Sequence, residues 1–306
     1  MYGSGARRAI AGFGVALLVS ITGCASDAAV ANPRDTEPSL RKGELPPLAE
    51  RYEDFDAATF DETSADVDNR FMPLRPGSRL AFKGSDKRGK GRSSHRVEII
   101  VTDLTRVIDG VNTTVVWERD FVGDTLDEAE LAYFAQDKVG NVWHLGEYSE
   151  VYDDGELVGA TGFLKGYLPG ARAGIIVPAD PTTGTPSYSE GYGPPPINWN
   201  DRGRVVATGR TTRVPAGKYT DVVVIEEYNE SELTEFQLKY YAPGVGNVRV
   251  GWRGQDESQE TLVLTEAESL DATKMKAVRQ AADELETRAR MNGTAPPAIP
   301  RAAPSE

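Results

Sequence analysis

Cysteine and histidine are almost absent from this chain of 306 residues, which contains one cysteine, Cys24, and two histidines, His95 and His144. A lone cysteine excludes an internal disulfide framework and any zinc site built from several cysteines. Two histidines without a Gly-x-Ser-x-Gly elbow give no support to a serine hydrolase, and their spacing gives none to a zinc site. The sequence therefore predicts no catalytic residue, no metal site and no cofactor, and the fold must depend on its apolar core.

Long apolar runs are also missing. The longest, Ala9 to Ile21, has thirteen residues, which reach only about 20 Å as a helix at ~1.5 Å per residue. A helix that crosses the ~30 Å hydrocarbon layer needs about 20 apolar residues. Because Arg7 and Arg8 precede this run, its pattern is that of a secretory signal.

The segment Ile21-Thr22-Gly23-Cys24 resembles a bacterial lipobox. The resemblance implies that the Cys24 thiol receives diacylglycerol and that the chain is cut before this residue. Cys24 would then be a lipid anchor, membrane lipid its partner, and the outer side of the bacterial cell membrane its location. The alternatives are an uncleaved anchor helix and a secreted protein with an incidental cysteine.

Positive charge is scarce, with 34 Lys and Arg against 47 Asp and Glu and a net charge of −13. Removing residues 1–23 takes away Arg7 and Arg8 but no acid, so the mature chain has a net charge of −15. Such a balance argues against binding nucleic acid or anionic lipid headgroups.

Composition divides the chain into five parts. We expect a signal peptide at 1–23, a lipidated disordered tether at 24–49, a β-rich domain at 50–268, a helix at 269–292 and a disordered tail at 293–306.

The central part has the turn signals of an antiparallel sheet. Asp109-Gly110, Gly140-Asn141 and Asp154-Gly155 lie between runs rich in β-branched and aromatic residues, as in hairpins. No alternation of strands with helices occurs. The predicted fold class is mainly β: a single antiparallel curved sheet, or an open barrel or sandwich, with a C-terminal α-helix appended.

Two segments stand apart from this pattern. Residues 168–200 are rich in proline with interleaved aromatics, and we expect a loop that packs on the sheet or covers a ligand. Residues 270–291 show a narrow apolar stripe, which predicts a helix that is loosely attached or that binds a partner.

Three further segments carry a family resemblance: Asp68 to Gly77, Ala135 to Trp143 and Tyr240 to Gly246. They resemble landmarks of a group of uncharacterised secreted bacterial proteins over roughly residues 50–267. Tyr-Ala-Pro-Gly-Val-Gly also resembles a turn of envelope proteins with curved, lipoprotein-carrier-like sheets. The chain departs from the group at His144 and at Gly193 to Pro196.

Candidate chemistry is confined to acids, a basic segment and aromatics. Glu118, Glu147 and Glu226 lie in or beside predicted strands, and Asp124 to Glu128 is acidic without the ligand order of an EF-hand. Gly84 to Ser94 has the composition of an exposed loop, with a basic tip at Lys87–Arg92 that could touch anionic wall polymer. Eight aromatics could fill the core, or they could line a concave sheet around a ligand: Trp117, Tyr133, Phe134, Trp143, Tyr148, Tyr152, Tyr167 and Trp252.

These observations favour a non-catalytic envelope or binding protein, anchored outside the cytoplasm, of unknown ligand. One alternative is a carrier of an apolar or lipid ligand in a β-sheet cavity, and a second is a carbohydrate-active enzyme. A large apolar cavity would distinguish the first, and two carboxylates across a cleft the second.

Overall fold

The protein is described from a computed structural model, which covers residues 7–8, 15–16, 52–89 and 91–291. Cys24, the tether at 24–49 and the tail at 293–306 lie outside the described residues, as does most of the signal segment. Within the described part, no helix is both long and apolar enough to span a membrane.

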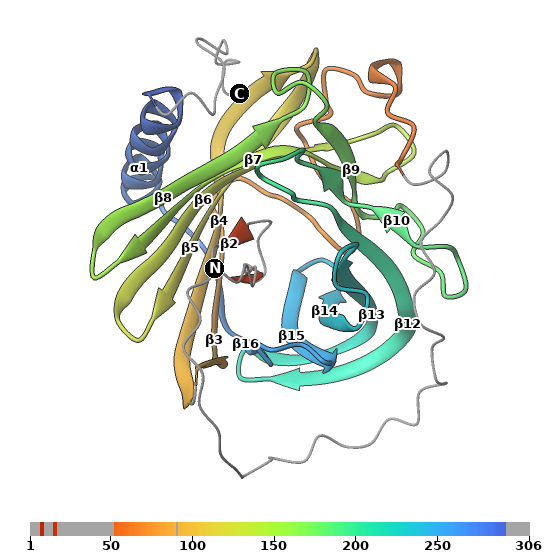
Figure 1. The fold of residues 1–306 in the computed structure, drawn as a ribbon. Coiled ribbons are helices and arrows are strands. Elements are labelled where there is room, and N and C mark those ends of the chain that lie inside the picture. The colour runs from red at the N-terminus through yellow and green to blue at the C-terminus, as the bar shows by residue number, and fades with distance from the viewer. Residues whose placement is uncertain (1–6, 9–14, 17–51, 90, 292–306) are drawn as a thin grey trace.

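The fold is one large open antiparallel sheet of 14 strands with a single C-terminal α-helix (Figure 1). The strand order is β10-β12-β13-β14-β15-β16-β3-β4-β5-β6-β7-β9-β11, and β8 also pairs with β7. The elements are β1 (Arg7–Arg8), β2 (Val15–Ala16), the 3-10 turn η2 (Ala57–Thr59), β3 (Ser78–Arg88), β4 (Gly91–Ile108), β5 (Val111–Val122), β6 (Thr125–Gln136), β7 (Val142–Asp153), β8 (Glu156–Leu164), β9 (Arg172–Val177), β10 (Tyr188–Ser189), β11 (Gly191–Tyr192), β12 (Asp201–Val214), β13 (Gly217–Asn229), β14 (Glu235–Ala242), β15 (Gly246–Gly254), β16 (Thr261–Ser269) and α1 (Ala272–Met291). β1 and β2 pair only with each other.

Hairpin chemistry explains the meander. Asp109 and Gly110 have φ of 48° and 83°, and Asp154 and Gly155 have φ of 49° and 82°. Positive φ at both central residues is the type I′ geometry, whose twist matches that of the flanking strands. These predicted turns are therefore confirmed.

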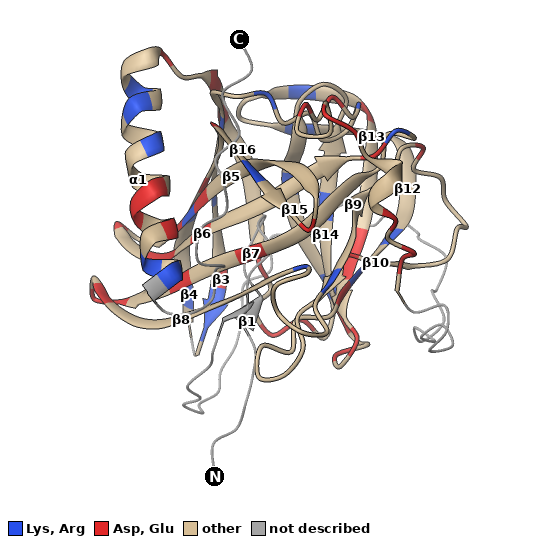
Figure 2. Ribbon diagram, turned by 90° about the horizontal axis from the view of Figure 1, so that it is seen from above, with Lys and Arg blue, Asp and Glu red and all other residues tan. Residues whose placement is uncertain are grey.

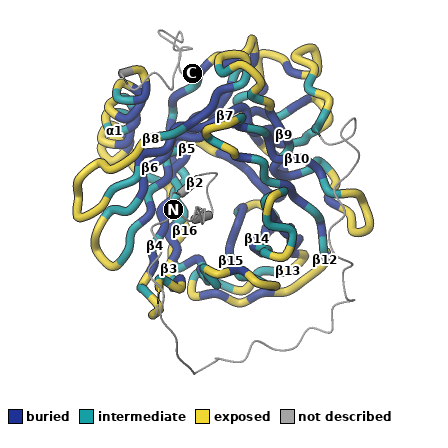
Figure 3. Tube along the Cα trace, in the orientation of Figure 1, coloured by how far each residue is buried: buried dark blue, intermediate teal, exposed yellow. Residues whose placement is uncertain are grey.

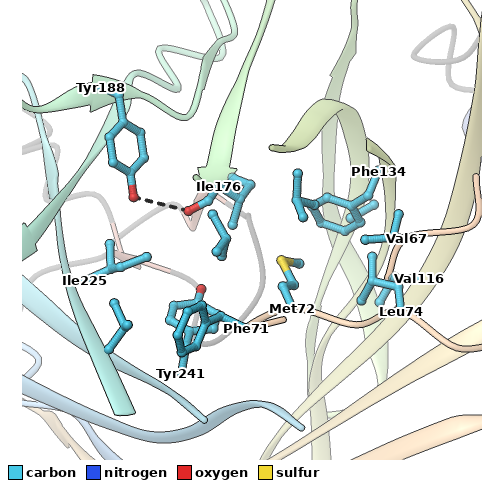
Figure 4. Close-up of a cluster of buried hydrophobic side chains, with 14 of the residues drawn as sticks. Val67, Phe71, Met72, Leu74, Val116, Phe134, Ile176, Tyr188, Ile225 and Tyr241 are labelled. Carbon is cyan, nitrogen blue, oxygen red and sulfur yellow. Dashed lines mark hydrogen bonds between the residues drawn. The ribbon is translucent and has the colours of Figure 1, made fainter. Parts of the chain in front are cut away.

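The sheet curls until its two halves face each other, and an apolar core fills part of the space between them (Figures 1 and 3). Val116 of β5 belongs to the same buried cluster as Val223 and Ile225 of β13. Phe71 and Met72, from the segment before β3, project between the two walls (Figure 4). This segment therefore fills the interior that the curled sheet would otherwise enclose.

Residues 168–200 form part of this packing. The segment contains β9, β10 and β11, and its Tyr188 and Trp199 are buried in the inner cluster. The segment is packed as expected, but the expectation of a loop is wrong, because β9, β10 and β11 pair with other strands of the sheet.

Two stretches are strands where the sequence predicts none. Gly84 to Ser94, expected as an exposed loop, forms the paired ends of β3 and β4. β6 begins within the acidic run after Asp124, because its outward side chains Ala129, Leu131 and Tyr133 are apolar and pack on the outer face. The acids that alternate with them obscured the strand pattern.

α1 packs on the outer face of the sheet over β4 and β6, so the expectation of a loosely attached helix is wrong. Met275, Val278 and Leu285 of α1 are buried, and the small Ala282 and Ala289 allow close approach to the sheet. Figures 1 and 2 show the helix outside the curled sheet. A narrow apolar stripe suffices here because the facing strands are apolar as well.

Of the two interpretations of the eight aromatics, core filling holds for most of them and lining of the concave side does not. Of the eight, only Phe134 belongs to the inner cluster. Tyr133, Trp143 and Tyr148 are buried in the outer cluster beside α1, with Trp117 and Tyr152 packed against it. Alternation along β5, β6 and β7 sends these side chains outward, and it sends the acids inward.

Candidate functional site

Carboxylates gather on the inner face of β5, β6 and β7. The register places Glu118 directly opposite Glu130 and Asp120 directly opposite Glu128. Glu147 lies opposite the inner-core residue Ala132, so it shares this face. These five residues, named here the inner acidic cluster, are all buried: Glu118 and Glu128 are 7% exposed, Asp120 4%, Glu130 2% and Glu147 1%.

Burial and mutual repulsion raise the pKa values of three members of the cluster. Burial raises the pKa of Glu118 well above its usual value, and the neighbouring Glu130 and Asp120 raise it further. Burial and Glu130 likewise raise the pKa of Glu128 and of Glu147 well above the usual range. Desolvation and like charge both disfavour the ionised form, so both shift the pKa of these three carboxyls in the same upward direction.

Glu147 is the least satisfied member. Neither of its carboxyl oxygens has a hydrogen-bond partner, and the nearest ion-pair atom, Nε2 of His144, is 3.6 Å away. Burial lowers the pKa of His144 to about 3, so this ring is neutral and offers no compensating charge. A buried polar group without a partner costs about 1–3 kcal/mol.

The opposite wall of the curled sheet carries a buried lysine that is paired with a carboxylate. Lys239 of β14 is 1% exposed, and its Nζ lies 2.5 Å from Oε2 of Glu227 of β13. Burial disfavours the charged ammonium group, but the negative charges of Glu227 and Glu190 outweigh this effect and raise the pKa of Lys239. Lys239 is close enough to counteract part of the shift in the pKa of Glu118, so the two walls face each other here.

A small cavity adjoins the cluster. Its volume is about 60 Å³, and its lining is mainly apolar, including Val101, Val116 and Phe134. Its polar lining includes Glu118 and Asn247, whose Nδ2 has no hydrogen-bond partner. A cavity of roughly 150 Å³ is known to hold one benzene molecule, so this space holds a short alkyl group but not an acyl chain.

His95 lies at the polar end of the same interior, buried between two carboxylates. Its Nε2 bonds Asp120, and its Nδ1 lies 2.9 Å from Oε1 of Glu260. Burial disfavours the protonated imidazole ring, but hydrogen bonds and attraction to the two carboxylates outweigh this effect and raise the pKa of His95 to about 10. A ring protonated on both nitrogens has no lone pair to act as a general base, so His95 holds strands together.

The other sequence candidates lie elsewhere. Glu226 is ion-paired with Arg204 and Arg253, away from the cluster. Arg88 of the basic tip is held by Asp127, with Nη2 2.8 Å from Oδ2. In the described part of the chain, no group of three or more acids or histidines has the geometry to hold a metal ion.

The sequence thus pointed to two members of the cluster, Glu118 and Glu147, but could not pair them. Glu128 was considered only within a calcium-like run, and Asp120 and Glu130 were missed. A period of two in the acids of β6, at 128 and 130, is the signal that could have found them.

The cluster predicts an unusual pH dependence of stability. A carboxyl whose pKa is raised in the folded state contributes stability that is fully present below the pKa of the unfolded chain and is lost as pH rises. We therefore expect Glu147→Gln to raise the free energy of unfolding by about 1–2 kcal/mol at pH 8.5, with little effect at pH 5. Thermal melts of both proteins at the two pH values test this.

Glu150, on the same strand but the outer face, is the matched control. Although burial opposes it, hydrogen bonds from Arg288 and Tyr152 lower the pKa of Glu150. Its stabilising contribution is present above the unfolded pKa, so Glu150→Gln should destabilise at pH 8.5. A Glu147→Gln protein that melts lower than wild type at pH 8.5 would contradict the account of the cluster.

Comparison with known proteins gives only distant likenesses. No protein-family model matches the chain. No curated protein matches it in sequence. A solved structure from Bacteroides fragilis, which carries the name of an exported protein with a YmcC-like fold, is 13% identical with a TM-score of 0.39, over 66% of this chain and 100% of the other. A second, from Parabacteroides distasonis, carries the name of a lipoprotein; it is 11% identical with a TM-score of 0.36, over 65% of this chain and 99% of the other.

Proposed function

We propose that this chain is a non-catalytic, lipid-anchored protein of the bacterial cell envelope that binds a ligand at the inner acidic cluster. The lipobox-like segment ending at Cys24 supports the location. The cluster supports the binding, and it is the observation on which the proposal rests.

The argument from the cluster is energetic. Like charges opposite each other in a sheet destabilise it, and replacing buried charged groups by apolar residues is often neutral or stabilising. Apart from Asp120, which bonds His95, these buried acids therefore cost stability in the fold. Groups with strongly shifted pKa values concentrate at functional sites.

The two alternatives receive less support. A lipid carrier needs an apolar cavity for an acyl chain, and the cavity beside Glu118 has only about 60 Å³. A glycosidase needs two carboxyl groups on either side of a sugar ring. Glu118 and Glu130 lie side by side on one wall.

The location is tested by Cys24→Ser. The variant should carry no acyl groups and should move from the detergent phase to the aqueous phase in a Triton X-114 partition, because stable anchoring depends on the attached chains. Wild-type protein from the same cells is the reference. A variant still recovered as a lipidated species would rule out the lipobox interpretation.

Binding is tested by native mass spectrometry of the soluble Cys24→Ser protein, released gently from its own envelope. We expect an adduct with the mass of a small molecule, and no adduct once Glu147→Gln is added. A phospholipid adduct would favour the carrier instead. Protein without any adduct would contradict the binding proposal.

A further inference from the structure

The cavity inside the curled sheet is bordered by both of its walls. Val116 and Phe134 line it from β5 and β6, and Tyr241 and Asn247 line it from β14 and β15. Met72, from the segment before β3, borders it between the two walls (Figure 4). Its volume is about 60 Å³, which admits about two or three non-hydrogen atoms if benzene needs roughly 150 Å³. The cavity therefore has room for a short chemical group.

Asn247 contributes an unused hydrogen-bond donor to this cavity. The residue is 7% exposed, and the register places it opposite Tyr241. Its Oδ1 accepts a hydrogen bond from the backbone N–H of Arg249 at 3.1 Å, which fixes the orientation of the amide because only the oxygen can accept. Its Nδ2 has no partner in the described part of the chain. A buried donor without a partner costs stability, so a ligand atom with a lone pair would complete the site.

Glu118 supplies the complementary chemistry from the facing wall. It lines the same cavity from β5 and is 7% exposed. Among the described residues, none donates a hydrogen bond to its carboxyl. A carboxyl group accepts hydrogen bonds in both of its protonation states, so a ligand with a donor fits here. Ser78 and Tyr241 also line the cavity, and their hydroxyls adapt to a donor or to an acceptor.

We propose that this cavity binds a neutral hydroxyalkyl group of about two or three non-hydrogen atoms. Its oxygen accepts from Nδ2 of Asn247, its O–H donates to Glu118, and its carbon atoms contact the apolar lining. As an account of the natural ligand, this rests on the function proposed above, and it names the chemistry of the end of that ligand that enters the sheet. A free small alcohol carries the same group.

Other small polar groups match only one of the two partners. An alkylammonium group has N–H donors and no acceptor, so it would face Nδ2 of Asn247 donor to donor. A carboxylate has acceptors only, and it would place a like charge beside Glu118. A nitrile accepts from Asn247 but donates nothing to Glu118. A hydroxyl both accepts and donates through one atom, which suits a space of this size.

The test is a nuclear magnetic resonance titration of the full-length Cys24→Ser protein with ethanol. The signals to follow are the side-chain amide of Asn247 and the backbone amide of Gly246, which both lie at the cavity. Ethylammonium, which only donates, and acetonitrile, which only accepts, are the size-matched controls. We expect saturable ethanol binding in the millimolar range, as so small a ligand allows. Both controls should bind about ten-fold more weakly or worse.

Variants of neighbouring residues locate the site. Val116→Ile adds a carbon atom to the cavity lining, and Val115→Ile adds the same atom to the outer cluster. Val116→Ile should weaken ethanol binding about ten-fold or more, whereas Val115→Ile should leave the Kd within about two-fold. Asn247→Asp keeps an acceptor for Arg249 but loses the donor, so it should also weaken binding about ten-fold or more. The Gly246 signal reports in every variant, thermal melts confirm folding, and either cavity variant alone suffices.

Three results would overturn the proposal. They are no saturable binding of ethanol, which would mean that the cavity holds only water; equal binding of either control; and ethanol binding unchanged in both Val116→Ile and Asn247→Asp. If native mass spectrometry shows an adduct that depends on Glu147 while ethanol does not bind, the proposed function stands and this site is wrong. Ethanol binding without an adduct would support a site for a free alcohol and contradict the function at Glu147. Absence of both would remove both.

Discussion

A chain that ends at Glu268 should lose most of its stability, because α1 completes the outer core. The truncation uncovers the sheet where Met275, Val278 and Leu285 pack, at about 1.5–3 kcal/mol for each large side chain. It also removes Glu286, the ion-pair partner of Arg106. Together these losses approach the ~5–15 kcal/mol stability of a whole domain.

The Arg106 pair is the most specific contact between helix and sheet. Its Nε and Nη2 donate to the two carboxylate oxygens of Glu286, each at 2.6 Å, and both residues are about 3% exposed. Removing one partner of a buried, bidentate ion pair lowers the free energy of unfolding far more than removing one partner of a surface pair does.

The truncation is measured by thermal melting and by solubility on expression. Leu285→Ala within the full chain should reproduce part of the loss, about 2–5 kcal/mol, while Glu284→Ala on the exposed side of α1 should be neutral. A truncated protein that melts like the full chain would mean that α1 adds nothing to the core.

Trp143→Ala should cost about 3–5 kcal/mol, the usual loss for a buried tryptophan. Trp143 is 5% exposed, and its ring meets Phe55 and Phe60 edge-on, with ring centres 5.6 and 6.0 Å apart. Trp143 belongs to the outer cluster and Val142 to the inner one, so the two neighbours face opposite sides of β7.

The indole also contributes to a turn. Trp143 Nε1 donates to Oδ2 of Asp137 at 2.8 Å, and Oδ1 of Asp137 accepts from the backbone N–H groups of Val139, Gly140 and Asn141. Trp143→Phe keeps most of the packing but loses this bond, so it should cost about 1–2 kcal/mol from the hydrogen bond. Chemical denaturation of both variants gives the comparison. A change below about 0.5 kcal/mol in Trp143→Ala would contradict burial.

Local chemistry accounts for what could be predicted. Asp-Gly pairs force positive φ and close hairpins, and the 3.6-residue period of the last segment forms a helix at Ala272–Met291, close to the expected 270–291. The all-β class follows from many short strands between such turns. All of these depend on residues near one another in the chain.

The candidate site could not be predicted in the same way. Glu118 and Glu130 are opposite each other only because β5 and β6 pair in one register, and a shift of one residue would turn them to opposite faces. The inner side is defined only by the curl of the whole sheet, which brings Lys239 of β14 across from Glu118.

The sequence by itself determined the all-β class, the hairpin turns at Asp109-Gly110 and Asp154-Gly155, the C-terminal helix and the segment around Cys24 that resembles a lipobox. Only the tertiary structure decided which face of each strand is inside, that α1 is part of the core, and that five carboxylates share one buried wall. The physical reason is that burial, pairing partners and pKa values depend on residues far apart in the chain, whereas turns and helices depend on neighbours.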